Sequence, residues 1–184
     1  SWIPNSPALL ILAGPLSFRA TCYYYRKFYY RAYFMSPPGC AVGGARQGKY
    51  RGETRLFLLQ NIHRYTLYLA LFYIAILYYD AYQAFFDTQG TPGIGVGSII
   101  LLLNPTLLAC YAFGCHSFRH LIGGHDDCMS GGKPTARFSL WKRATACNER
   151  HMQFAWLSLF WVMFTDVYVR LVSMGVFHDL NTWN

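Results

Sequence analysis

The sequence predicts an all-α integral membrane protein, a bundle of four transmembrane helices in a single domain over residues 1–184. First, 54% of the residues are apolar and only 13% are charged, too few for the polar surface of a soluble domain. Second, no Lys, Arg, Asp or Glu occurs between Thr88 and Phe118, a stretch longer than the roughly 20 residues that cross a bilayer. Third, basic residues gather between the apolar stretches.

The first two expected spans differ in strength. The first covers about 7–30, contains Pro15 and Arg19, and ends in a stretch rich in Tyr, Arg and Lys. Tyrosine is typical of the membrane interface, where its ring is buried and its hydroxyl is hydrated. The second covers about 61–86, with Asp80 near its far end. A short segment rich in glycine follows it and predicts a turn.

The last two spans also contain helix-perturbing or charged residues. The third covers about 98–120 and includes Pro105, which a span tolerates when neighbouring groups satisfy the freed carbonyl. The fourth covers about 151–174. It contains Asp166 and Arg170, and because they are four residues apart we expect them to face each other and pair.

Charge predicts the orientation. The net charge is +8, but the basic residues other than Arg19 and Arg170 lie in or beside two hydrophilic loops, about 36–55 and 123–150. This is the positive-inside pattern and not a nucleic-acid surface, so both loops are expected in the cytoplasm. With four spans, both termini then lie on the non-cytoplasmic side, and the protein is multi-pass in the cell inner (plasma) membrane.

The chain contains six cysteines and six histidines. All the cysteines fall in the membrane or on its cytoplasmic side, where structural disulfides are disfavoured. Four histidines lie at the cytoplasmic ends of the expected spans, in one layer that Cys22 and Cys115 also reach. Ionisable residues at membrane depth are functional candidates, and this layer predicts a metal or redox site. The four histidines are His63, His116, His120 and His151.

Two kinds of redox centre are compatible with this layer of histidines. No histidines on different spans lie at opposite depths, which disfavours a stack of two haems. One haem b with two histidine ligands fits, and so does an iron–sulfur centre with two cysteines and two histidines. The Cys-x-His and Cys-x-x-His spacings of soluble Rieske proteins do not occur, so such a centre would be assembled between helices.

Six ordered stretches carry a resemblance to a known family. They are Cys22-Tyr-Tyr-Tyr-Arg-Lys-Phe-Tyr-Tyr-Arg31, Ser36-Pro-Pro-Gly-Cys40, Tyr50-Arg-Gly-Glu-Thr-Arg55, Gln60-Asn-Ile-His-Arg-Tyr65, Cys115-His-Ser-Phe-Arg-His120 with Gly123-Gly124, and Arg150-His-Met-Gln-Phe-Ala-Trp156. Together they resemble the cytochrome b-like membrane anchor of an actinobacterial-type succinate dehydrogenase (respiratory complex II). The resemblance extends from about Cys22 to Asp179.

The resemblance implies a task and partners. Such an anchor docks a flavoprotein subunit and an iron–sulfur subunit, and it passes electrons to a quinone, here expected to be menaquinone. It is a subunit of the enzyme and holds no dehydrogenase active site itself. The resemblance also implies a Rieske-type [2Fe–2S] cluster in place of haem. Phe118 stands where relatives often have a second cysteine, so that ligand must come from elsewhere.

These implications assign the candidate residues. The metal candidates are Cys22, Cys115, His63, His116, His120 and His151, with Cys147 and Cys40 as reserve sulfur ligands. The quinone candidates are Arg64, Ser117 and Arg119, of which the arginines would polarise a quinone carbonyl; lipid headgroups or subunit docking are their other reading.

Three other functions compete with this interpretation. A haem b-type electron-transfer subunit without docked dehydrogenase subunits would use the same histidines. A membrane di-iron oxygenase would use His116 and His120 as a His-x-x-x-His box, but its His-x-x-His-His boxes do not occur in the sequence. A purely structural anchor would hold no cofactor.

Overall fold

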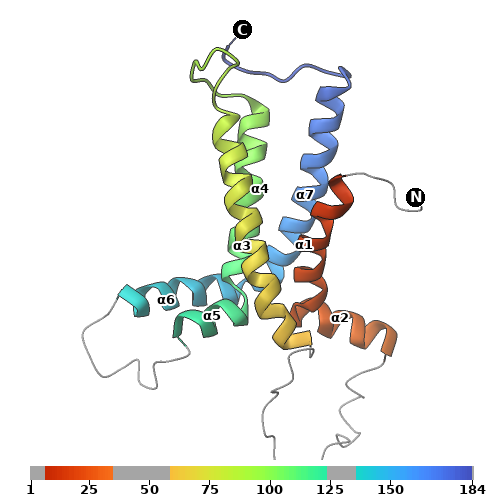
Figure 1. Ribbon diagram of the computed structural model, residues 1–184, viewed down its shortest axis with the longest axis vertical. Coiled ribbons are helices and arrows are strands. Elements are labelled where there is room, and N and C mark those ends of the chain that lie inside the picture. Colours follow the sequence, from red (N-terminus) through yellow and green to blue (C-terminus); the bar gives the residue numbers. More distant parts are fainter. Residues whose placement is uncertain (1–6, 35–58, 124–135, 184) are drawn as a thin grey trace, which may run out of the picture. The chain divides into compact units, whose positions relative to one another are not determined.

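The computed structural model describes residues 7–34, 59–123 and 136–183, which form seven α-helices and no strand (Figure 1). The all-α prediction is confirmed for these residues. The chain divides into two compact units, Ser1–Ala70 and Leu71–Asn184, and each is described by itself. The expected loop over 36–55, with Cys40, lies outside the described residues.

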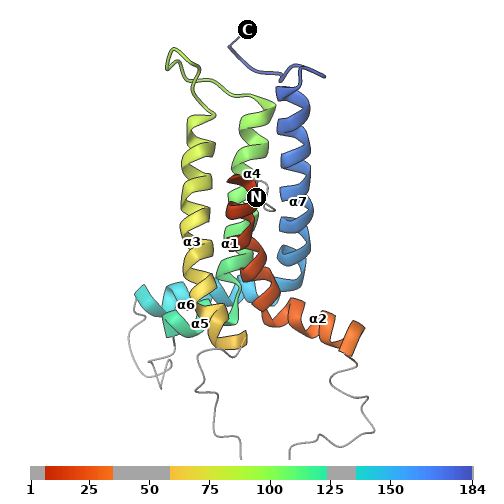
Figure 2. The ribbon, with the colours of Figure 1, turned by 45° about the vertical axis from the view of Figure 1, so that its right-hand side comes forward.

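The first unit contains α1 (Pro7–Thr21), α2 (Tyr23–Phe34) and the beginning of α3 (Leu59–Gln83). The single helix expected over about 7–30 is therefore two helices, interrupted at Cys22, and α2 leaves α1 at an angle (Figure 2). The amide of Cys22 is shared between the carbonyls of Phe18 (3.1 Å) and Arg19 (3.2 Å). Such sharing tightens the last turn of a helix. The break also separates an apolar helix from one rich in Tyr, Arg and Lys.

The second unit is built around α4 (Val96–Phe113) and α7 (His151–Ser173), which run antiparallel side by side (Figures 1 and 2). Within the described residues, these two helices are long and apolar enough to cross a membrane. Small side chains are buried on both, which is typical of helices that pack closely in a bilayer. They are Ala109 and Ala112 on α4, and Ala155, Ser158 and Thr165 on α7.

Many of the large apolar side chains of these two helices are exposed. Leu102, Leu157, Phe160 and Met163 are all exposed. A soluble protein would bury such residues, whereas a lipid-facing surface needs them. Pro105 of α4 cannot donate a backbone hydrogen bond. Close to this interruption, the indole Nε1 of Trp161 on α7 donates to the carbonyl of Ile100 (3.2 Å).

The expected boundary of the third span is corrected by the structure. The helix ends at Phe113, not near residue 120, and His116 begins a separate helix, α5 (His116–Gly123). Part of the expected loop over 123–150 is also helical, as α6 (Ala136–Glu149). Gly114 caps α4, and its amide donates to the carbonyl of Cys110 (3.0 Å). Half of the 14 residues of α6 are Ala, Arg, Leu or Lys, which favour helix. It lies against α5 at the end of α4 (Figure 1).

A clamp closes the opposite end of the second unit, where the segment after α7 meets the start of α4. The carboxylate Oδ1 of Asp179 accepts from the amide of Gly97 (3.0 Å) and from the hydroxyl of Tyr168 (2.6 Å). Because Gly97 lies in the first turn of α4, Asp179 supplies the negative charge that a helix N-terminus favours. The amide of Val96 donates to the carbonyl of Leu180 (2.9 Å). The backbone of Leu180 and the side chain of Asp179 therefore both hold the start of α4.

Tyr168→Phe should lower the stability of the second unit. The substitution removes a hydrogen bond to a carboxylate, which contributes about 1.5–3 kcal/mol. We expect a lower midpoint for thermal unfolding of the purified membrane complex. Tyr79→Phe is the matched control, because the exposed Tyr79 hydroxyl bonds only Gln83 in the described residues, one helical turn along α3. Equal midpoints for the two variants would contradict the clamp.

Candidate functional site: two buried histidine environments and an arginine clamp

The first unit buries two of the expected metal candidates. Cys22 lies at the break between α1 and α2 with 1% of its surface exposed, and His63 in the first turns of α3 is 4% exposed. The ring of Phe18 stacks on that of His63, with centroids 4.8 Å apart and planes 9° from parallel. Arg64, a quinone candidate, is exposed on the same helix.

Two threonines orient His63. The hydroxyl of Thr21 lies 3.0 Å from Nδ1 of His63 and 2.7 Å from the carbonyl of Ser17, and Thr66 lies 3.1 Å from Thr21. A carbonyl only accepts, so the short contact to Ser17 takes the single hydroxyl proton of Thr21. When Thr21 donates to Ser17, Nδ1 of His63 is the donor to Thr21, whereas the other tautomer of the ring would accept from Thr21. In the first of these tautomers the lone pair of the ring is on Nε2, from which an imidazole accepts a hydrogen bond or ligates a metal.

Sequence reasoning missed both threonines. Thr21 immediately precedes the candidate Cys22, and Thr66 is close to one helical turn from His63. Spacing alone could have suggested Thr66 as a neighbour of His63. No sequence signal pairs Thr21 with His63, which are 42 positions apart.

The second unit holds another packed histidine. His151 begins α7, and its ring stacks on Tyr111 of α4, with centroids 5.0 Å apart and planes 15° from parallel. Gly114 makes this approach possible, because a Cβ atom there would lie 2.8 Å from the carbonyl oxygen of Cys147 and 3.0 Å from Nδ1 of His151. Cys115, the next residue, is 3% exposed.

An arginine clamp, formed by Arg119, Trp141 and Asn148, joins α5 to α6. The Nη1 of Arg119 donates to Oδ1 of Asn148 (3.1 Å), and the guanidinium lies over the ring of Trp141, 5.2 Å from its centroid. The Nδ2 of Asn148 in turn donates to the carbonyl of Gly114 (2.6 Å). A predicted quinone residue is thus tied to the end of α4 by residues that the sequence did not single out.

The other candidates of this region lie along α5. His116 is its first residue, and His120 follows at a spacing that puts both on one side of the helix. Both are exposed, and Ser117 is half-buried. They therefore belong to a short helix of their own, and the expectation that they close the third span is corrected.

Within neither described unit do the residues expected to hold a cluster form one group. Across the described residues, no three His, Cys, Asp or Glu side chains lie close enough together to hold a metal ion. A [2Fe–2S] cluster of the Rieske type needs two cysteines and two histidines. The described arrangement does not fit that four-ligand centre.

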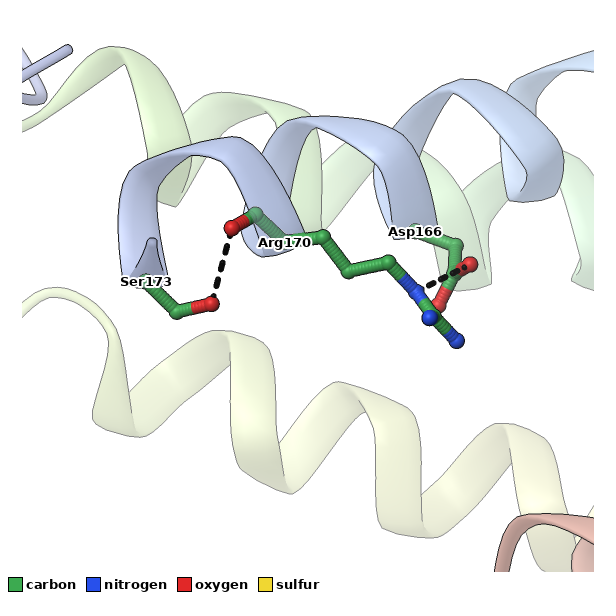
Figure 3. A network of polar contacts seen from close by, with 3 residues as sticks. All are labelled: Asp166, Arg170 and Ser173. Carbon is green, nitrogen blue, oxygen red and sulfur yellow. Dashed lines mark hydrogen bonds and ion pairs between the residues drawn. The ribbon is translucent and has the colours of Figure 1, made fainter. Parts of the chain in front are cut away.

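The predicted ion pair on α7 is confirmed. The Nε of Arg170 lies 2.8 Å from Oδ2 of Asp166, and Figure 3 shows the two side chains meeting along the helix, with Ser173 bonded to the Arg170 carbonyl. Both side chains are well exposed, at 69% and 62%. Their helix is one of the two with the length and composition of a membrane span.

Comparisons with known proteins agree with the sequence resemblance. A family model described as actinobacterial succinate dehydrogenase subunit SdhC matches residues 1–175. The chain is also similar to a solved structure described as the Mycobacterium smegmatis Sdh1 complex in the apo form, with 43% sequence identity and a TM-score of 0.78. That match covers 98% of this chain and 69% of the other. A search of curated proteins gave no match.

Proposed function

Because the chain belongs to the actinobacterial succinate dehydrogenase SdhC family, and is thus a membrane subunit of that enzyme complex, we propose that it docks the flavoprotein and iron–sulfur subunits and passes electrons to a membrane quinone. The arginine clamp is the observation that supports the proposed electron transfer to a quinone. It holds a permanent positive charge in a half-buried position against an aromatic ring.

The chemistry of the clamp suits quinone reduction. Negative charge develops on the quinone oxygens as electrons arrive, and a guanidinium held in place stabilises that charge. Burial strengthens the interaction, because water competes less for the donors. Arg119 is therefore the proposed donor to a quinone carbonyl, and Ser117, two residues earlier on α5, and Arg64 remain proposed quinone residues.

The proposed topology has four spans, over about 7–30, 61–86, 98–120 and 151–174 in a single domain, with cytoplasmic loops and both termini on the other side. The antiparallel pair of α4 and α7 supports it, because their joined ends at Gly114 and His151 adjoin the basic residues of α5 and α6. Labelling of cysteine from outside intact cells tests the orientation.

A redox group in this chain is a separate proposal. Cys22, Cys115, His63, His116, His120 and His151 remain the proposed ligands. Within neither described unit do they form the two-cysteine, two-histidine set of a Rieske-type cluster. One haem b needs only one or two histidines, and His63, in the tautomer with Nδ1–H toward Thr21, has the chemistry of such a ligand. The optical spectrum of the reduced complex distinguishes a haem from an iron–sulfur centre.

The function is tested by comparing two electron acceptors in the purified complex. With Arg119→Gln, succinate oxidation by a soluble dye should continue at the normal rate, while kcat/KM for a short-chain naphthoquinone should fall about 100-fold, as for the loss of one oxyanion donor. Arg143→Gln, an exposed arginine on α6, is the matched control. Normal naphthoquinone kinetics in Arg119→Gln would remove the proposed role of Arg119.

A further inference from the structure

Asn148 joins three elements of the second unit. Its Nδ2 donates to the carbonyl of Gly114 at the end of α4, and its Oδ1 accepts from Arg119 on α5, while Asn148 itself belongs to α6. The two partners fix the orientation of the amide, because a carbonyl can only accept and a guanidinium can only donate. A flipped amide would lose both hydrogen bonds.

The guanidinium of Arg119 is consequently held at two places. Nη1 bonds Asn148, and the face of the group lies over Trp141. Nε is buried and has no hydrogen-bond partner in the part of the chain that the structure describes. A buried N–H without an acceptor is costly, and in a native protein it calls for a partner such as a ligand or an ordered water.

We propose that Asn148 is a positioning residue of the quinone site, which holds Arg119 so that its buried Nε–H donates to an oxygen of the quinone headgroup. This inference rests on the proposed function. An oxygen acceptor fits because a guanidinium donates and never accepts. A quinone carbonyl and a lipid phosphate both supply such an oxygen, and we assign the site to the quinone.

The arginine clamp holds α5 in the position that the proposed quinone contact requires. α5 is a short helix separated from α4 by a break, so its backbone alone does not fix the position of Arg119 relative to α4. Asn148 bridges that break, because it bonds the carbonyl of Gly114 on one side and Arg119 on the other. A change at Asn148 should therefore affect quinone binding through Arg119, without removing any group that touches the quinone.

The test uses the complete membrane complex with two variants of Asn148. Asn148→Leu has a similar volume but loses both hydrogen bonds, whereas Asn148→Asp keeps an oxygen acceptor for Arg119 and loses the N–H that donates to Gly114. With a short-chain naphthoquinone, the KM of the Leu variant should rise about tenfold, as expected for a lost hydrogen bond to a charged group. The KM of the Asp variant should rise less, because Asp keeps the acceptor for Arg119 and loses only the donor to Gly114. Thr145→Val is the control, because its hydroxyl bonds only the carbonyl of Trp141, within α6.

The results distinguish a failure of the positioning role of Asn148 from a failure of the proposed function. Dye-linked succinate oxidation should be normal in all variants. If wild type reduces the naphthoquinone and Asn148→Leu has an unchanged KM, or if Asp is as harmful as Leu, the positioning role is overturned while the function stands. If the wild-type complex reduces the dye but not the naphthoquinone, the proposed function itself fails.

A lipid phosphate as the occupant of the site is distinguished by the assay medium. In lipid-depleted detergent micelles, the KM difference between wild type and Asn148→Leu should persist, because the quinone is the acceptor. A difference that appears only after phosphatidylglycerol is added would assign the Nε–H to a lipid phosphate and overturn the proposal.

Discussion

Replacing Gly114 with valine should prevent the second unit from packing and abolish quinone reduction by the complex. A Cβ atom at this position would lie 2.8 Å from the carbonyl oxygen of Cys147 and 3.0 Å from Nδ1 of His151. The first neighbour is backbone of α6 and cannot rotate away, so the end of α6, and with it the adjoining start of α7, must move from the end of α4. Overpacking of this kind costs about 1–3 kcal/mol, and valine adds two methyl groups to the overlap. The yield of assembled complex and its thermal midpoint measure the effect.

The control for this variant is a similar substitution that meets no such overlap. Ala146→Val adds two methyl groups to an exposed position of α6, one residue before Cys147. Surface substitutions usually change stability by less than about 0.5 kcal/mol, so this variant should assemble normally. The Gly114→Ala complex should have a thermal midpoint between those of the Gly114→Val and Ala146→Val complexes. A Gly114→Val complex with a normal midpoint would show that the close approach of Cys147 is not required.

Removing only one member of the ion pair on α7 should impair membrane insertion more than removing both. Asp166 and Arg170 lie 2.8 Å apart, and each is well exposed on the helix surface. In water an exposed pair contributes about 0–1 kcal/mol, so losing either residue would change little. In a bilayer, a lone charge at the centre of a span costs about 2.5–3.5 kcal/mol on insertion scales, and somewhat less toward the end of the helix, where Arg170 lies.

The experiment compares three variants expressed with the other subunits. Asp166→Leu and Arg170→Leu should each reduce the amount of chain recovered in the membrane, and the double variant should recover most of the wild-type amount. Equal recovery of all three would mean that this face of α7 is in water, and it would contradict the expectation that α7 crosses the membrane along its full length.

Local patterns made several features predictable from the sequence alone. The long uncharged stretches and the sparse charge predict an all-α membrane protein, and the described residues are all helical apart from turns and connecting segments. The pair of Asp166 and Arg170 depends only on a spacing of four within one helix, which is why it was found. The family resemblance was carried by ordered motifs, and the match over residues 1–175 confirms it.

The helix breaks were not predictable from hydropathy. A hydropathy average taken over a window runs across Cys22 and Gly114, so the sequence suggested longer spans over 7–30 and 98–120, although the residues after both positions are more polar. The structure ends the helices at Thr21 and Phe113, because the hydrogen-bond ladder changes at the following residues. A hydropathy average does not detect such a change, since it depends on backbone hydrogen bonds and not on side-chain polarity.

Only the tertiary structure decided which side chains act together. The sequence determined that histidines and arginines lie near the ends of apolar helices, but it did not select Thr21 as the partner of His63 or Asn148 as the partner of Arg119. These pairs join separate helices, and their contacts depend on the rotation and depth at which one helix packs on another. That packing is set by the shapes of many side chains at once, so no spacing within one helix reveals it.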